Sequence, residues 1–116
     1  MKQIVMQGPR KSCVVEVPMP EFTDDQLLVK VTYTGMCHSE WYPWSIAKEG
    51  GIFGHEAVGV VAEAGKNVQG FKPGDRVTGL GGGGYKEYIV MDPVKTCHVP
   101  DNLKDEDAIV EPLACL

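Results

Sequence analysis

The 116-residue sequence predicts a mainly β fold, a barrel or a sandwich with a few short helices. Short runs rich in β-branched and aromatic residues recur along the chain and are typical of strands. Proline and glycine separate these runs where the backbone has to reverse, for example at Gly8-Pro9, Lys72-Pro73-Gly74-Asp75 and Asp92-Pro93. We therefore expect strands at residues 2–6, 12–17, 27–34, 57–64, 76–78, 86–91 and 95–99.

Helical signals are few. A weak one covers residues 39–44, and a better one follows Pro100, where Asp101 or Asn102 would cap the helix. A further helix is expected to begin at Pro112 with Glu111 as its cap, because proline suits the first helical position. The chain ends one turn later, which indicates a truncated domain.

Length and charge narrow the function classes. A chain of 116 residues is one domain, large enough to bury a core, and 43% hydrophobic with 23% charged residues is an ordinary globular composition. The net charge of −5 argues against nucleic acid and anionic membranes as partners. The N-terminus lacks the apolar segment of a secretory signal, so we expect a cytoplasmic protein.

The four cysteines are spread along the chain without a CxxC pair, at Cys13, Cys37, Cys97 and Cys115. This spacing suits a reducing compartment better than a disulfide framework. Most of them are expected to pack as small hydrophobic side chains.

Three short segments carry chemistry-bearing residues: 35–40 with Cys37 and His38, 54–59 with His55 and Glu56, and 111–115 with Glu111. Together they supply a thiol, imidazoles and carboxylates, which is the ligand set of an open catalytic zinc site. A buried cysteine or a single histidine is weak evidence by itself, because most such residues are structural. The combination is what indicates a metal.

The second segment continues with Gly65, Phe71 and Gly74-Asp75-Arg76-Val77, followed by Gly84-Tyr85-Lys86-Glu87-Tyr88. This pattern resembles the zinc-dependent medium-chain alcohol and polyol dehydrogenase family, from the first expected strand to the last residue. The resemblance implies that residues 1–116 form a GroES-like β-barrel, the catalytic domain of such an enzyme. It also implies a homo-oligomer for the complete enzyme and a small alcohol or polyol as substrate.

Carried over by position, the resemblance implies one catalytic zinc bound by Cys37 and His55, with Glu56 either binding directly or exchanging with substrate and water. Zinc would act as a Lewis acid that lowers the pKa of the substrate hydroxyl. Ser39 would receive the proton, and hydride would pass to the nicotinamide of NAD or NADP. His38 falls where a basic residue often meets the cofactor pyrophosphate.

Further positions follow from the same resemblance. Glu40 matches an acidic residue that would orient His55. Trp41, Tyr42 and Trp44 are expected to line the substrate pocket, with barrel packing as the alternative.

Glu111 and Cys115 compete for the remaining zinc position. Classical alcohol dehydrogenases use a cysteine at the position of Cys115, whereas polyol-dehydrogenase-like relatives with an EPL motif use the glutamate. We favour Glu111, because a helix that begins at Pro112 leaves Glu111 projecting from the helix end.

The sequence also departs from the family. The cysteine-rich lobe that holds a second, structural zinc in many relatives is absent, so we expect a single zinc. Tyr42 stands where some relatives have a second relay histidine. The run at residues 79–84 satisfies GxGxxG, but a β-rich segment follows it instead of a helix, so we reject a dinucleotide site there. Without a nucleotide-binding domain, we expect the chain alone to be inactive.

Two other readings stay open. A GroES-like structural or binding module without catalysis would not need Cys37, His55 and Glu56 together. A zinc-free reductase of the quinone oxidoreductase kind typically lacks these ligands.

Overall fold

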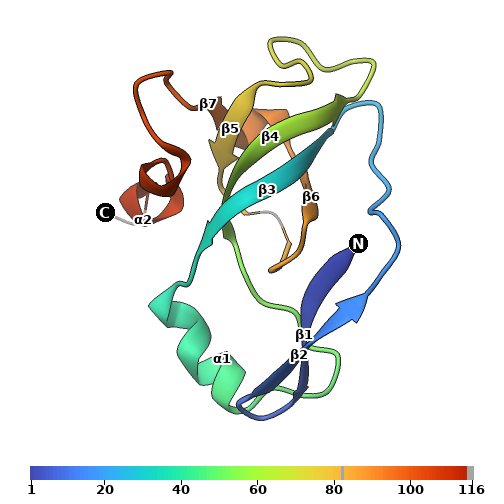
Figure 1. Ribbon diagram of the computed structural model, residues 1–116, viewed down its shortest axis with the longest axis vertical. Helices are drawn as coiled ribbons and strands as arrows, with labels where there is room; N and C mark the ends of the chain where they lie inside the picture. Colours follow the sequence, from blue (N-terminus) through green and yellow to red (C-terminus); the bar gives the residue numbers. More distant parts are fainter. Residues whose placement is uncertain (82, 115–116) are drawn as a thin grey trace.

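The computed structural model describes residues 1–81 and 83–114, and these residues form a mainly β fold, as predicted (Figure 1). Within this part of the chain the strands are β1 (Lys2–Gly8), β2 (Lys11–Glu16), β3 (Leu27–Gly35), β4 (Glu56–Ala64), β5 (Arg76–Gly79), β6 (Tyr88–Met91) and β7 (Thr96–His98). The α-helices are α1 (Trp41–Ser45) and α2 (Glu111–Ala114), and the 3-10 helices are η1 (His38–Glu40), η2 (Pro93–Lys95) and η3 (Asp105–Asp107).

Five strands form one antiparallel sheet in the order β6-β3-β4-β5-β7, and β1 and β2 form a separate hairpin. The hairpin joins the loop before β6 through a bridge between Gln3 and Lys86. Among the described residues the strands do not close into a complete barrel, because β6 and β7 each pair on one side only. The predicted class is therefore right, and the barrel is open.

The core lies in the five-stranded sheet. Its buried side chains alternate along the strands, and each of the larger ones contributes about 1.5–3 kcal/mol through the burial of apolar surface. The cluster consists of Leu27, Val29, Ala57, Val61, Val77, Ile89 and Met91. A smaller cluster places Val99 and Ala108 against Val58 on β4 and so fixes the path of the chain that leads to α2.

The helices differ in part from the prediction. The weak signal at 39–44 corresponds to η1 and α1, whereas the helix expected after Asp101 or Asn102 is wrong: the described chain forms only η3 there, without a side-chain cap. The Arg76 guanidinium holds this segment in an irregular turn by donating to the carbonyl oxygen of Leu103, at 2.6 Å, and to Asp105. None of the described helices has the length and apolar character needed to cross a bilayer.

Candidate metal centre

The end of the β3–β4 ladder brings three of the predicted ligands together. Gly35, the last residue of β3, is paired with Glu56, the first residue of β4. The chain leaving β3 carries Cys37 two residues later, and His55 comes immediately before Glu56. Gly54 allows the chain to turn just before His55, because its φ of 106° lies in the left-handed region that favours glycine.

Four side chains from three segments converge at this point: Cys37, His55, Glu56 and Glu111. One donor atom from each lies within 4.8 Å of all the others. The Nε2 atom of His55 is 3.7 Å from Glu111 Oε1 and 4.0 Å from Glu56 Oε1. Residue Glu111 is the first residue of α2, one position earlier than the predicted helix start. Cys115, the competing candidate, lies outside the described residues.

Glu56 is buried, with 5% of its surface exposed. Burial raises the pKa of its carboxyl, and a hydrogen bond with the neighbouring Glu111 side chain raises it further. Gly35 makes room for this side chain, because a Cβ atom there would overlap Glu56 Oε2. The site thus holds a buried carboxylate in a space that any larger residue at position 35 would fill.

Glu40 contacts the other side of the His55 ring, as predicted. Its Oε1 lies 3.2 Å from His55 Nδ1 and also accepts a 2.5 Å hydrogen bond from the backbone N–H of Gly54. A carboxylate on Nδ1 leaves Nε2 as the nitrogen that faces the two other carboxylates.

Ser39 and His38 both lie on η1, next to Cys37. The Ser39 hydroxyl donates to Cys37 Sγ at 3.0 Å, so it lies beside the cluster of donor atoms. His38 is exposed and borders the cavity described next. The proton-transfer role of Ser39 and the pyrophosphate role of His38 stay predictions.

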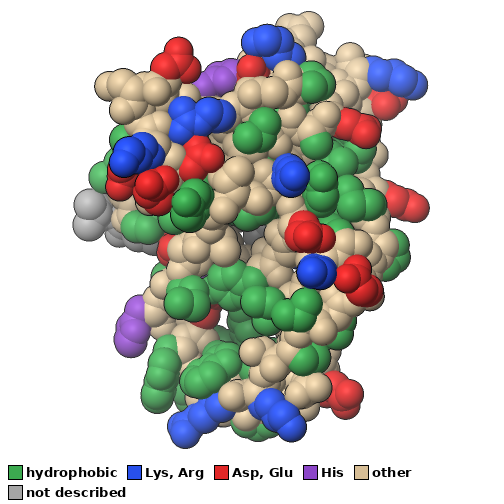
Figure 2. All heavy atoms as spheres, viewed as in Figure 1, with side chains coloured by type: hydrophobic (Ala, Val, Ile, Leu, Met, Phe, Trp, Pro, Cys, Tyr) green, Lys and Arg blue, Asp and Glu red, His purple; other side chains and the backbone are tan. Residues whose placement is uncertain are grey.

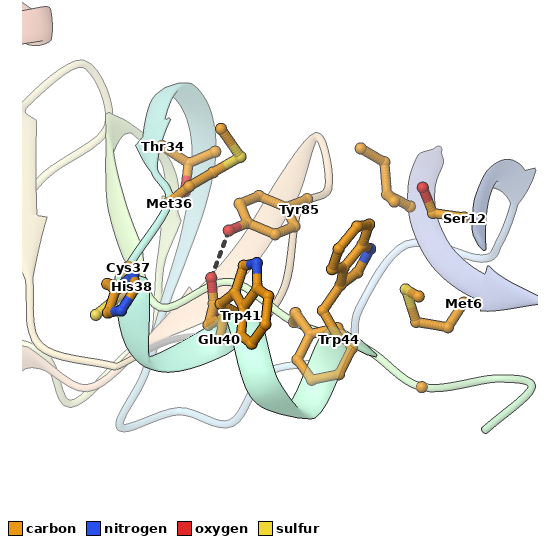
Figure 3. A pocket seen from close by; sticks show the side chains of 13 residues that line it. Met6, Ser12, Thr34, Met36, Cys37, His38, Glu40, Trp41, Trp44 and Tyr85 are labelled. Carbon is orange, nitrogen blue, oxygen red and sulfur yellow. Dashed lines mark hydrogen bonds between the residues drawn. The ribbon is translucent and has the colours of Figure 1, made fainter. Parts of the chain in front are cut away.

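A cavity of about 520 Å³ opens beside Cys37, between α1 and the β1–β2 hairpin (Figure 3). Its lining is dominated by apolar side chains, among them Ile4, Met6, Met36, Trp41, Trp44 and Phe53. No lysine or arginine occurs among the described lining residues. Figure 2 shows hydrophobic side chains gathered over this end of the molecule.

Two of the three aromatic residues expected at the substrate pocket lie at this cavity, and its role as that pocket stays a prediction. Trp41 and Trp44 line the cavity, whereas Tyr42 does not and is 66% exposed. Residues at i and i+3 share a helix face, but residue i+1 points elsewhere, so Tyr42 faces away.

Tyr85 is the residue that the sequence analysis missed. Its hydroxyl donates a 2.5 Å hydrogen bond to Glu40 Oε2, and its ring lines the cavity (Figure 3). Tyr85 and Glu40 are 45 positions apart, so no local pattern predicts the pair. The only available signal was a polar aromatic residue directly after a glycine run.

The chain matches the alcohol dehydrogenase GroES-like domain over residues 23–101. It belongs to that family. It is 32% identical over 120 residues to a trans-enoyl reductase of Aspergillus sclerotiorum, covering 93% of this chain and 34% of the relative. It is 30% identical over 151 residues to the D-arabitol-phosphate dehydrogenase of Enterococcus avium, covering 99% of this chain and 43% of the relative. The chain therefore spans less than half of either relative.

The fold agrees with this family assignment. The alcohol dehydrogenase of Thermus sp. ATN1 superposes with a TM-score of 0.85 at 24% identity, over 95% of this chain and 43% of that one. As in the sequence analysis, a strand follows the glycine run at 79–84: among the described residues β6 comes next, and no helix begins there. The run is therefore not placed to bind a dinucleotide at a helix N-terminus.

Proposed function

We propose that this chain is the zinc-binding catalytic domain of an NAD(P)-dependent alcohol dehydrogenase. The observation that carries the proposal is the convergence of Cys37, His55, Glu56 and Glu111, whose donor atoms lie within 4.8 Å of one another. Membership of the GroES-like dehydrogenase family supports it. The chain alone is proposed to be inactive, because none of its described segments provides a dinucleotide-binding fold.

The donor set suits zinc better than a hard cation. One sulfur, one imidazole nitrogen and carboxylate oxygens match the ligands that zinc takes in catalytic sites, whereas calcium and magnesium prefer oxygen alone. The space at Gly35 and the buried position of Glu56 fit a carboxylate that approaches a cation. When bound, zinc would lower the pKa of a substrate hydroxyl so that hydride transfer to nicotinamide becomes accessible near neutral pH.

The residues of the chain then have distinct tasks. Cys37, His55 and Glu111 would hold the metal, and Glu56 would either bind it directly or exchange with substrate and water. Ser39, whose hydroxyl already lies 3.0 Å from Cys37 Sγ, takes the proton from the substrate hydroxyl. His38, exposed at the edge of the cavity, meets the pyrophosphate of the cofactor.

The cavity favours an apolar alcohol over a phosphorylated polyol. A phosphate group requires cationic or N–H donors, and the described lining offers no lysine or arginine. Its imidazole, His38, is the group assigned above to the cofactor pyrophosphate and not to the substrate. Trp41, Trp44 and Phe53 offer apolar and aromatic surface instead. The phosphorylated substrate named for the Enterococcus relative is therefore not the one proposed for this chain.

Zinc content tests the proposal. We expect the purified chain to hold one zinc ion, measured by inductively coupled plasma mass spectrometry, and Cys37→Ser and His55→Ala to lose most of it. Cys97→Ser and His98→Ala are matched controls, because both residues are exposed on β7. If the parent and the two site variants hold the same amount of zinc per chain, the metal binds elsewhere and the proposed mechanism is wrong.

One alternative has a specific observation in its favour. The similarity to a trans-enoyl reductase favours a reductase over a dehydrogenase. In the sequence analysis the reductase alternative is an enzyme without zinc. That reading predicts a zinc-free parent protein, so the same measurement separates it from the proposal. A purely structural module predicts no zinc either.

A further inference from the structure

The Glu40 carboxylate is held from three directions. Its Oε1 accepts from Gly54 N–H and faces His55 Nδ1, while its Oε2 accepts from the Tyr85 hydroxyl at 2.5 Å. The two oxygens of the carboxylate thus have different partners. A carboxylate can rotate about its last bond, and distinct partners on the two oxygens remove that freedom.

Tyr85 is itself fixed to the segment that carries His55. Its backbone N–H donates to the Phe53 carbonyl at 2.9 Å, and its carbonyl accepts from Ile4 N–H at 2.9 Å. A Cβ atom on Gly54 would lie 3.0 Å from the backbone of Gly84 and Tyr85, so the two segments pack backbone to backbone. The Tyr85 hydroxyl is therefore held at a set distance from the loop that ends in His55.

Glu40 has less support from its own element. It lies in the three-residue helix η1, whose N-cap makes no side-chain hydrogen bond. Such a short helix does little to fix a glutamate side chain. The contacts that orient the carboxylate come from Gly54 and Tyr85.

The phenol also stays a donor. Burial raises the pKa of Tyr85, and the hydrogen bond to Glu40 raises it further, so the hydroxyl keeps its proton throughout the physiological range. It therefore stays available as a hydrogen-bond donor to Glu40 Oε2.

We propose that Tyr85 is a positioning residue for the metal centre. Its hydroxyl fixes Glu40 so that Oε1 faces His55 Nδ1, and this contact orients His55 Nε2 toward the other donors. The inference rests on the proposed zinc site. It goes further because it assigns a role to a residue whose hydroxyl bonds to Glu40 and not to one of the four candidate ligands.

Tyr85→Phe tests the proposal, because it removes the hydroxyl and keeps the ring. We expect zinc to bind about 10-fold more weakly, measured by competition with a chromophoric chelator, which is the lower end of the loss typical for groups that support metal ligands. The absorption bands of the Co²⁺-substituted protein should also change, because the geometry of the imidazole ligand changes. The thermal midpoint of the metal-free protein should stay close to that of the parent.

Tyr88→Phe on β6 is the matched control and should leave both zinc affinity and the Co²⁺ spectrum unchanged. A double-mutant cycle adds a test that holds even if Tyr85→Phe is less stable. In a Glu40→Gln background, Tyr85→Phe should weaken zinc binding by less than 2-fold further, because the carboxyl group that the tyrosine positions against His55 is already absent.

Parental zinc affinity in Tyr85→Phe, or fully additive losses in the cycle, would overturn the role of Tyr85. If Cys37→Ser still loses its zinc, the proposed function survives that result. A parent protein without zinc would overturn both proposals together.

Discussion

The two ends of the β3–β4 ladder are built differently. At one end Leu27, Val29 and Val61 are completely buried, or nearly so, in the sheet core. At the other end Gly35 is paired with Glu56, and the chain continues directly into the cluster of metal donors. Apolar side chains stabilise the first end. At the second end Gly35, which has no side chain, leaves space for the carboxylate of Glu56. The sheet core and the candidate metal centre thus lie about one strand length apart on β3 and β4.

Two glycines of this ladder show the difference directly. At Gly59, which pairs with Val31, an added Cβ would overlap the backbone oxygen of Lys30 and lie 2.8 Å from Val29 Cγ1. At Gly35, an added Cβ would overlap only the side chain of Glu56. The first obstacle is a paired backbone within the core, and the second is a side chain that can rotate.

The largest effect is therefore expected for Gly59→Ala. The neighbouring backbone cannot move without breaking ladder hydrogen bonds, so we expect a loss of about 3 kcal/mol or more in the free energy of unfolding. Urea denaturation of the metal-free protein measures it. A loss below about 1 kcal/mol would mean that the ladder is more pliable than the packing indicates.

Gly35→Ala should mainly affect the metal. We expect zinc affinity to fall about 10-fold to 100-fold, because Glu56 has to leave its position, while the metal-free protein loses less stability than Gly59→Ala does. Chelator competition and urea denaturation give the two values. Gly83→Ala is the control, since a Cβ there meets only Lys86 Nζ at 3.8 Å. Unchanged zinc affinity would show that Glu56 does not need this space.

The core end was the easier one to predict from sequence. Runs of valine, isoleucine and leucine between glycine and proline turns predicted the strands within a few residues, because burial imposes a short-range pattern. The candidate ligands were also found, since motifs name Cys37, His55, Glu56 and Glu111 directly, and the structure brings them together. Whether they bind zinc stays a prediction.

What sequence reasoning missed depends on contacts between distant segments. The Tyr85–Glu40 bond joins the 3-10 helix η1 to the loop before β6, and nothing near either residue indicates the other. The helix expected after Asp101 fails for the same reason, because Arg76 on β5 holds the segment in another shape. The error at Tyr42 was avoidable, since helical spacing places Trp41 and Trp44, and not Tyr42, on one face.

Between the two ends, the ladder contains a bulge. Val31 pairs with Gly59 and Tyr33 pairs with Val58, so Thr32 is left without a partner in the register. Its hydroxyl donates instead to Asp105 Oδ2 at 2.8 Å, and Asp105 Oδ1 accepts from Arg76 Nε at 2.8 Å. Asp105 thereby connects η3 to the point where the core end becomes the site end.

Asp105→Asn sharpens the comparison with the smallest expected effect. The variant weakens a hydrogen-bonded ion pair, so we expect a loss of about 1–2 kcal/mol in the free energy of unfolding at pH 7, reduced by the partial exposure of both partners. Zinc affinity should stay unchanged, because Asp105 contacts the middle of the ladder and not the donors. Asp107→Asn, at an exposed position of η3, is the control.

The pH dependence of this loss follows from the sign of the pKa shift. Burial alone would raise the pKa of Asp105, but the hydrogen bonds from Arg76 and Thr32 outweigh it and lower the pKa below its usual value. A lowered pKa in the folded state stabilises the protein above the unfolded value of about 3.9, and the contribution is lost as the pH falls through the folded value. The gap between parent and Asp105→Asn should therefore be constant from about pH 5 to 8 and shrink below about pH 4. Urea titrations across this range measure the gap, and one that persists undiminished in acid would show that packing, and not the charge of Asp105, ties η3 to the bulge.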